Sequence, residues 1–509
     1  MTSNVATKTQ DTRPSSLRWW REPSVWIMLL LGFSAGIPIL LIFSSLSLWL
    51  REAGVSRSAV TFFSWAALGY SFKFVWAPLV DRLPIPFLSA WMGRRRSWLL
   101  LSQAAIISAI LLMANTDPTI SLTTMALAAV LLGFSSATQD VVIDAFRIES
   151  AEPRLQAMLS STYIAGYRTG MIVAGAGALY LAQYFGSTAD SYSYSAWKTA
   201  YTCMAAAMLV GVITTFVISE PKTSKDRLYG APTKDYLRFF LVFALSIGAL
   251  IAVFMFTPST PELFTGGLQA VVAFLYASVV LALALSAAFA VARISLKLHW
   301  VDQQMVNEGY VEPIRDFFAR YGRLAIWVLL LVGFYRISDI VMGVITNVFY
   351  QDVGFSKIQI AEVTKVFGVL MTILGSFLGG ILALRFGVMR ILMLGAVLVA
   401  ITNLSFVWLS YQEPLTHYLA GVIVLDNISQ GIAIAAFIAW LSSLTNVSFT
   451  ATQYAIFSSV MTLFPKLIGG FSGTMVEAMG YANFFVLASV MGIPVIILIY
   501  YLRDKLELK

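Results

Sequence analysis

Residues 25–48 have the sequence VWIMLLLGFSAGIPILLIFSSLSL, and this run contains no charged side chain. A helix needs about 20 predominantly apolar residues to cross a bilayer. The run is therefore long enough for a membrane span, and it is too long for the core of a signal peptide. Because unpaired backbone groups cannot face lipid, we expect it to be helical.

The same pattern continues through the whole chain, which is 59% hydrophobic and 12% charged with a mean hydropathy of +0.79. A soluble domain carries about 25% charged residues. We therefore predict an all-α polytopic membrane protein with fourteen spans, at residues 25–48, 59–80, 98–114, 119–143, 157–183, 197–218, 237–256, 269–292, 322–349, 356–384, 390–411, 416–440, 452–476 and 481–502.

Few residues of this chain suit enzyme chemistry. The single cysteine, Cys203, excludes an internal disulfide and a cysteine metal site. The two histidines, His299 and His417, lie in predicted connecting segments, and we find neither a phosphate-binding loop nor a soluble catalytic domain. We therefore predict no enzymatic activity, no cofactor and no bound metal.

Lysine and arginine are distributed unequally between the two sides of the predicted bundle. Of the 34 basic residues, 25 fall in the tails and loops of one side and four in the loops of the other. Cytoplasmic loops carry the excess of basic residues in membrane proteins. We therefore expect both termini in the cytoplasm, and we attribute the net charge of +8 to these loops rather than to nucleic-acid binding.

The sequence repeats itself weakly. Gly54-Val55-Ser56 corresponds to Gly354-Phe355-Ser356, and Arg168, seven residues after a Ser-Ser pair, corresponds to Lys466 in the same position of the second half. Such a parallel repeat is typical of transporters built from two six-helix halves. The repeat predicts a cytoplasmic tail at 1–24, halves at 25–218 and 322–502, an inserted hairpin with linkers at 219–321, and a tail at 503–509.

The inserted hairpin comprises spans 237–256 and 269–292, and we expect it to be structural or lipid-facing. The long segment 293–321 after it is mixed in charge, so we expect a surface amphipathic helix that links the halves.

Charged residues inside the spans are the strongest functional signal. Each costs about 2.5–3.5 kcal/mol at mid-membrane when unpaired, so these side chains must face a polar cavity or one another. Five are basic and three acidic, and the surplus of positive charge suits an anionic substrate. They are Lys73, Asp140, Arg168, Arg336, Asp339, Lys365, Asp426 and Lys466.

Several of these charges also have structural interpretations. Arg336 and Asp339 are spaced i,i+3 and can pair on one helix face. Asp144, near the end of its span, can anchor the following loop by pairing with Arg147. Lys73 and Lys365 could extend to the membrane interface instead of lining a cavity.

Proton coupling is assigned first to Asp140, because this carboxylate lies deep in the fourth span, with Asp339 and Asp426 as further candidates. The aromatic rings of Trp65, Tyr70, Tyr163 and Tyr167 could stack on sugar rings or form ordinary interfacial contacts. The predicted substrate-binding residues are Lys73, Arg168, Lys466, Arg336, Lys365, Gln139, Tyr163 and Tyr167.

The loop after the second span contains Asp81-Arg82 and then Gly93-Arg94-Arg95-Arg96. It resembles the loop between the second and third helices of the major facilitator superfamily. The resemblance implies a major facilitator fold in which Asp81, Arg82, Arg94 and Arg95 lock neighbouring helices in one access state. Ordinary membrane anchoring would explain the arginines but not the aspartate.

A narrower resemblance is carried by blocks in both halves. The chain is similar to the AmpG muropeptide permease family, although it has Arg336, Asp426 and Lys466 where that family commonly has Lys, Glu and Arg. The blocks are residues 32–38 (GFSAGIP), 70–82 (YSFKFVWAPLVDR), 93–100 (GRRRSWLL), 136–146 (SATQDVVIDAF), 166–171 (GYRTGM), 313–318 (PIRDFF) and 449–455 (FTATQYA).

This resemblance implies a monomeric permease of the bacterial inner membrane, surrounded by lipid. Such a permease imports 1,6-anhydro-muropeptides from periplasm to cytoplasm with protons, for peptidoglycan recycling and, in many bacteria, β-lactamase induction and antibiotic resistance. The alternatives are a related carrier of another organic anion, such as acetyl-CoA, and a membrane sensor that does not transport.

The basic loops generate a topology prediction. Reporter domains fused after Ser224 and after Lys509 should both report from the cytoplasm in intact cells, because both sites lie on the basic side of the bundle. A periplasmic signal from either fusion would contradict the predicted topology.

Overall fold

The structure is a computed structural model that describes residues 19–55, 70, 72–152, 155–187, 191–221, 233–258, 267–355, 357–469 and 472–506. The regular elements in these ranges are helical. The first half begins with η1 (Trp19–Arg21) and comprises α1 (Pro23–Leu40), η2 (Leu41–Ser45), α2 (Leu46–Glu52), η4 (Lys73–Val75), α5 (Ala77–Arg82), α6 (Leu88–Met92), α7 (Arg94–Ala114), α8 (Leu122–Ser150), α9 (Gln156–Ile172), η6 (Val173–Gly177), α10 (Ala178–Tyr184), α11 (Tyr194–Ala207) and α12 (Leu209–Val217).

The middle segment and the second half continue in the same way. The middle segment comprises α14 (Thr233–Phe256), α15 (Gly267–Lys297), α16 (Gln303–Val306), η7 (Asn307–Val311) and α17 (Glu312–Tyr321). The second half comprises α18 (Leu324–Phe334), α19 (Ile337–Val353), α20 (Lys357–Ile360), η8 (Ala361–Phe367), α21 (Gly368–Phe386), α22 (Val388–Leu409), α23 (Thr416–Leu444), η9 (Val447–Phe449), α24 (Thr450–Gly469), α25 (Ser472–Val490) and α26 (Gly492–Leu506).

Nine helical stretches in the described ranges are long and apolar enough to cross a membrane. The count of fourteen spans remains a prediction, because several predicted spans are interrupted or lie partly outside the described residues. Span 25–48, for example, contains α1 and α2 separated by the π-helical turn η2, and span 157–183 contains α9 and α10 separated by η6.

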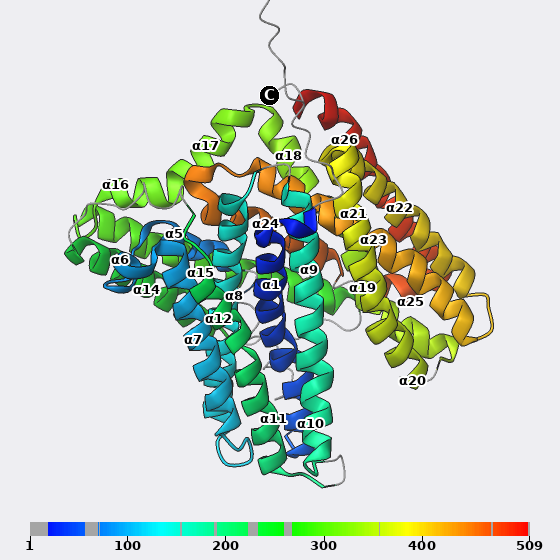
Figure 1. Cartoon of the computed structure of the whole chain (residues 1–509). Coiled ribbons are helices and arrows are strands. Elements are labelled where there is room, and N and C mark those ends of the chain that lie inside the picture. Colours follow the sequence, from blue (N-terminus) through cyan, green and yellow to red (C-terminus); the bar gives the residue numbers. More distant parts are fainter. Residues whose placement is uncertain are drawn as a thin grey trace, which may run out of the picture.

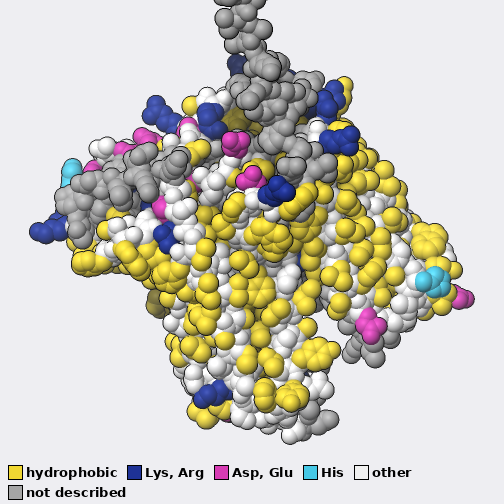
Figure 2. Space-filling view, in the orientation of Figure 1, with side chains coloured by type: hydrophobic (Ala, Val, Ile, Leu, Met, Phe, Trp, Pro, Cys, Tyr) yellow, Lys and Arg dark blue, Asp and Glu magenta, His cyan; other side chains and the backbone are white. Residues whose placement is uncertain are grey.

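The two halves meet at one end of the molecule and diverge toward the other (Figure 1). We call the end that carries α17, the start of α1 and the end of α26 the closed end. At the opposite end α10 and α11 of the first half lie well away from α20 of the second, and the space-filling outline is notched between the halves (Figure 2). The chain therefore has a wedge-shaped architecture.

Close helix contacts in each half depend on glycine. A Cβ on Gly36 of α1 would meet the carbonyl oxygen of Tyr167 in α9, and a Cβ on Gly166 of α9 would meet the carbonyl oxygen of Leu29. In the second half, a Cβ on Gly375 of α21 would meet the carbonyl oxygen of Ile428 in α23. Small residues allow membrane helices to pack backbone against backbone in this way.

The weak sequence repeat has a structural counterpart at chain reversals. Gly54 and Gly354, which correspond in the two halves, have φ angles of 80° and 107°. Gly93 and Gly387, at the starts of α7 and α22, have φ angles of 91° and 89°. A residue with a side chain rarely adopts such angles, so glycine is needed at both turns of each half.

The inserted hairpin, α14 and α15, packs on the first half near the closed end. Phe239 and Val242 of α14 lie in one hydrophobic cluster with Trp76 and Leu79. The far end of α14 is exposed, with Phe256 86% accessible.

Helix α17 lies in the segment where a surface amphipathic helix is expected. It buries Pro313 and Phe317 and exposes Ile314, Arg315 and Phe318. This short helix is the last element of the middle segment and directly precedes α18 of the second half.

Candidate functional site

A buried group of charges lies in the first half, between η4 and α8. The Lys73 Nζ is 3.7 Å from the Asp144 Oδ2, and Asp140 lies one turn earlier on the same face of α8. Lys73 also attracts the charge of Asp140. The hydroxyl of Tyr163 in α9 donates to the Asp140 Oδ1 at 3.4 Å. All three charged residues are less than 9% exposed, so their charges must be satisfied within the protein.

Local structure places Lys73 in this group. Pro78 lies in the first turn of α5, where a missing N–H is tolerated, and the chain before it forms the tight turn η4. Two hydrogen bonds hold the turn. The Trp76 Nε1 donates to the Thr138 Oγ1 of α8 at 3.1 Å, and the Tyr310 hydroxyl donates to the Val75 carbonyl at 2.9 Å. Lys73 is thereby directed at α8 instead of extending along its helix to the interface.

Arg147 extends the charged group toward the second half. Its Nη2 lies 3.4 Å from the Asp144 Oδ1, which is the pair expected from the sequence. Its Nη1 donates to the side-chain oxygens of Gln156 at 3.2 Å, Ser160 at 3.1 Å and Ser442 at 2.8 Å. Because Ser442 belongs to α23, the fully buried Arg147 connects the halves. Sequence reasoning missed this contact and the pairing of Lys73 with Asp144.

Arg168 lies on α9, near the division between the halves. Its guanidinium donates to the Met171 Sδ at 3.8 Å, and within the described residues no carboxylate lies within ion-pair distance of it. It interacts electrostatically with Arg336 and Asp339 of the second half. Arg168 is therefore a half-buried cation that forms no ion pair among the described residues. Its positive charge is available to bind an anion.

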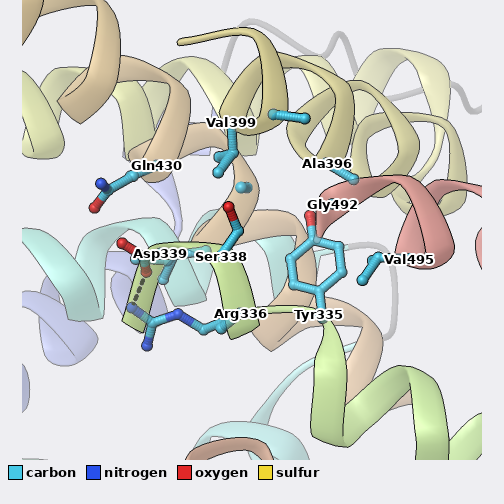
Figure 3. A pocket seen from close by; sticks show the side chains of 12 residues that line it. Tyr335, Arg336, Ser338, Asp339, Ala396, Val399, Gln430, Gly492 and Val495 are labelled. Atoms are coloured by element: carbon cyan, nitrogen blue, oxygen red, sulfur yellow. Dashed lines mark hydrogen bonds and ion pairs between the residues drawn. The ribbon is translucent and has the colours of Figure 1, made fainter. Parts of the chain in front are cut away.

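A second polar group lies in the second half. The Arg336 Nη2 is 2.5 Å from the Asp339 Oδ2, as their i,i+3 spacing leads us to expect. Figure 3 shows this pair in the wall of a small cavity of about 20 Å³, with Gln430 of α23 projecting toward the same space. The Gln430 Nε2 donates to the Asp426 Oδ2 at 2.9 Å, and the Asp426 Oδ1 has no partner among the described residues.

The remaining predicted site residues form no ion pair in the described part of the chain, or their side chains lie outside it. Gln139 is fully buried, and neither polar atom of its amide has a hydrogen-bond partner in the described part of the chain. The rings of Tyr163 and Tyr167 have centroids 6.0 Å apart, and Asp140 acts electrostatically on both. Lys365 lies in η8 and Lys466 in α24, but their side chains, like residue Trp65, fall outside what the structure describes.

At the closed end, Asp81 holds the second half against the first. Its carboxylate accepts hydrogen bonds from the main-chain N–H groups of Ala451 at 3.1 Å and Thr452 at 2.7 Å, and from the Thr452 hydroxyl at 2.8 Å. These groups form the first turn of α24. An anion there satisfies free N–H groups and interacts favourably with the helix dipole.

Arginines complete this contact. The Arg95 Nη2 is 2.8 Å from the Asp81 Oδ1 and 2.6 Å from the Glu149 Oε1, and Glu149 accepts from the Thr450 hydroxyl at 2.7 Å. Arg94 donates to the main-chain oxygen of Asp81. Burial alone would raise the pKa of Asp81, which follows the predicted span 59–80. The guanidinium groups of Arg95 and Arg94 lower that pKa below its ordinary value, so the carboxylate stays ionised.

The linker helix α17 is attached to the same region. Asp316 accepts from the Asn446 Nδ2 and from the Gln453 Nε2, both at 2.9 Å. Arg320 donates to the Leu444 carbonyl at 3.0 Å, and Arg82 pairs with Glu308 of η7 at 3.6 Å. The sequence blocks 313–318 and 449–455 had suggested no role, and their polar residues prove to contact one another.

Together these groups place buried charges in both helical halves, which are joined at one end and separate at the other. Buried cations of this kind can bind an anion, and buried carboxylates can take up or release a proton. No group of three or more His, Cys, Asp or Glu side chains able to hold a metal ion occurs in the described ranges.

The family model of the Major Facilitator Superfamily matches residues 28–334 and 325–509, and the chain belongs to this superfamily of multi-pass membrane transporters. It is related to AmpG-type permeases, as the sequence blocks led us to expect. It is 28% identical over 488 residues to putative transporter AmpG 4 of Rickettsia felis, covering 96% of this chain and 98% of the relative. It is 29% identical over 493 residues to the anhydromuropeptide permease of Escherichia coli K12, covering 96% and 82%.

Solved structures confirm the predicted major facilitator fold. The proton:xylose symporter XylE matches with a TM-score of 0.59 at 13% identity, covering 94% of both chains. The transporter FucP in its outward conformation matches with a TM-score of 0.57 at 12% identity, covering 95% of this chain and 99% of that one. At these identities the likeness concerns the fold alone.

The closed end yields a prediction about its stability. Asp81→Asn should destabilise the closed arrangement by about 3 kcal/mol, because it leaves Arg95 with an incomplete set of counter-charges in a buried site. Spin labels on the exposed positions Ala90 and Ser443, in a Cys203→Ser background, should then show longer distances. Glu308→Gln, which breaks a more exposed pair, is the control and should leave the distances unchanged. Identical distances for Asp81→Asn and the parent would refute the role of Asp81.

Proposed function

We propose that this chain is a proton-coupled importer of 1,6-anhydro-muropeptides in a bacterial inner membrane, serving peptidoglycan recycling. The observation that carries the proposal is the similarity, over 96% of this chain and 82% of the relative, to a protein named anhydromuropeptide permease. The buried cations of the site support it, because these ligands carry lactyl and peptide carboxylates. The proposal keeps the division into halves 25–218 and 322–502 with the insert 219–321 between them.

The proposed direction is import, with the closed end on the cytoplasmic side. Lys and Arg side chains gather near that end in Figure 2, and few are visible at the opposite end. The positive-inside rule then assigns the diverging end to the periplasm. In this orientation the diverging end of the two halves faces the side on which muropeptides are released.

Substrate carboxylates would bind to Lys73 and Arg168, with Lys466, Arg336 and Lys365 as further candidates. Arg168 is the strongest of these, because no carboxylate pairs with it in the described part of the chain, whereas Arg336 already has Asp339. The adjacent rings of Tyr163 and Tyr167 present faces on which a sugar ring could stack.

Proton coupling would centre on Asp140. Lys73 is shared between Asp140 and Asp144, so a substrate carboxylate that engages Lys73 reduces the positive charge available to Asp140. A buried carboxylate that loses its counter-charge favours the protonated form. Substrate and proton would therefore be taken up together, and they would be released together when Lys73 returns to the carboxylates.

The deciding experiment is uptake of labelled GlcNAc-anhydroMurNAc and its peptides into vesicles that contain the purified chain. Accumulation should require a pH gradient, acidic outside, and collapse when a protonophore is added. Absence of uptake, with gradient-driven accumulation of acetyl-CoA or another organic anion instead, would reject the proposed substrate. Uptake driven by sodium alone would reject the proposed coupling ion.

Neutralising the cations should weaken substrate binding. Lys73→Gln, Arg168→Gln and Lys466→Gln should each raise the KM for uptake about tenfold or more, the expected effect of losing one charge-assisted hydrogen bond. The control is Arg238→Gln, which removes an exposed cation of the inserted hairpin and should have no effect. Normal KM values in all three variants, with normal amounts in the membrane, would remove these residues from the site.

Asp140→Asn should abolish accumulation driven by a pH gradient while leaving counterflow exchange measurable. Asparagine keeps the shape of the side chain and can still interact with Tyr163, but it cannot bind and release a proton. Accumulation at the parental level would contradict this role of Asp140 and would leave Asp339 or Asp426 as the proton-carrying residue. Both activities are measured in the same vesicles, so a misfolded variant would be recognised by the loss of exchange.

A further inference from the structure

An apolar groove with a volume of about 750 Å³ lies between α18 and α26. Every residue that lines it is apolar or aromatic, and Trp327, Leu330, Ile497 and Tyr501 on its walls are between 37% and 62% exposed. The groove therefore opens on the outer surface of the second half, where lipid surrounds a membrane protein. Its lining contains none of the charged residues of the candidate site.

Breaks in two helices account for this groove. Phe334 and Ile337 flank the interruption between α18 and α19, Met491 forms the one between α25 and α26, and Pro494 lies in the first turn of α26. All four residues line the groove. The groove therefore lies at the level where the helical hydrogen bonding of both spans is interrupted.

Cations flank the same end of the two spans that form the groove. The apolar spans begin at Leu324 and end at Arg503, so we expect Arg323 and Lys505 at the membrane boundary. The rings of Trp327 and Tyr501, both in the groove wall, have centroids 5.8 Å apart, and the Lys505 Nζ lies 3.4 Å from the Tyr501 centroid. Aromatic rings below cations are typical of the level at which lipid head groups lie.

We propose that this groove is a specific binding site for an anionic phospholipid, with an acyl chain between α18 and α26 and its phosphate at Arg323 and Lys505. The occupant must be apolar along the groove and negatively charged at its mouth, and an anionic bilayer lipid has both properties. A zwitterionic lipid fits the groove less well, because its own cation faces Arg323 and Lys505. The inference requires only that the chain spans a lipid bilayer, and it does not depend on which substrate is transported.

The groove also adjoins the polar cavity of the second half. Val495 lines both spaces, and Phe334 and Ile337 flank Tyr335 and Arg336 in sequence (Figure 3). A bound acyl chain would thus pack against the helix interruption that presents Arg336. The lipid would support this interruption from the membrane side.

Native mass spectrometry of the full chain in detergent tests the proposal directly. Phosphatidylglycerol and phosphatidylcholine with identical acyl chains are added separately, and the retained fraction of each is measured. Phosphatidylglycerol should be retained several-fold more, and Arg323→Gln and Lys505→Gln should each reduce its retention about fivefold. Leu330→Trp, which narrows the groove at its wall, should reduce retention of both lipids.

Two controls make the outcome decisive. Arg385→Gln removes a cation that lies over the Phe386 ring at the end of α21, 5.4 Å from its centroid, and should change nothing. The charge-conserving change Arg323→Lys should keep the preference for phosphatidylglycerol. Equal retention of the two lipids, unchanged retention in Leu330→Trp, or displacement of the lipid by soluble glycerophosphate at equal concentration would overturn the proposal.

Discussion

The carboxylate of Asp81 at the start of α24 is the contact on which the arrangement of the two halves depends. Three hydrogen bonds from the first turn of α24 reach this one side chain, and Arg95 connects it to Glu149 on α8. The free N–H groups of a helix start can be satisfied by an anion from another part of the chain, so a single carboxylate can close one end of the molecule. The wedge shape in Figure 1 follows, because the halves are joined here and are separate at the opposite end.

Buried charge also connects the candidate site of the first half with the second half. Lys73, Asp144 and Arg147 form a continuous chain of ion pairs, and Arg147 ends it with a hydrogen bond to Ser442 of the second half. A buried charge that loses its partner destabilises the protein. Removing one of these charged side chains therefore leaves its neighbours without a counter-charge. These contacts tie the charged group of the first half to α23 of the second half.

Glycine and helix interruptions position the site within each half. Backbone contact at Gly36 and Gly166 holds α9 against α1, which leaves Tyr163, Tyr167 and Arg168 in place on α9. The tight turn η4 directs Lys73 at α8, and the interruption between α18 and α19 presents Arg336. The polar residues therefore depend on irregular backbone, which membrane proteins tolerate where it is buried in protein or lines a cavity.

The sequence by itself determined the membrane class, the helical structure, the superfamily and the pairs that are local on one helix, such as Arg336 with Asp339 and Asp144 with Arg147. The membrane class and the helices follow from composition, and the local pairs follow from the helical period, which places residues three or four apart on one face. The superfamily was indicated by the resemblance of the loop at residues 81–96 to that of known members. Only the tertiary structure decided that Lys73 pairs with Asp144, that Asp81 caps α24, and that Asp316 holds Asn446 and Gln453. Helical periodicity relates a residue to its own helix alone, and the packing of different helices sets the distances between residues far apart in the chain.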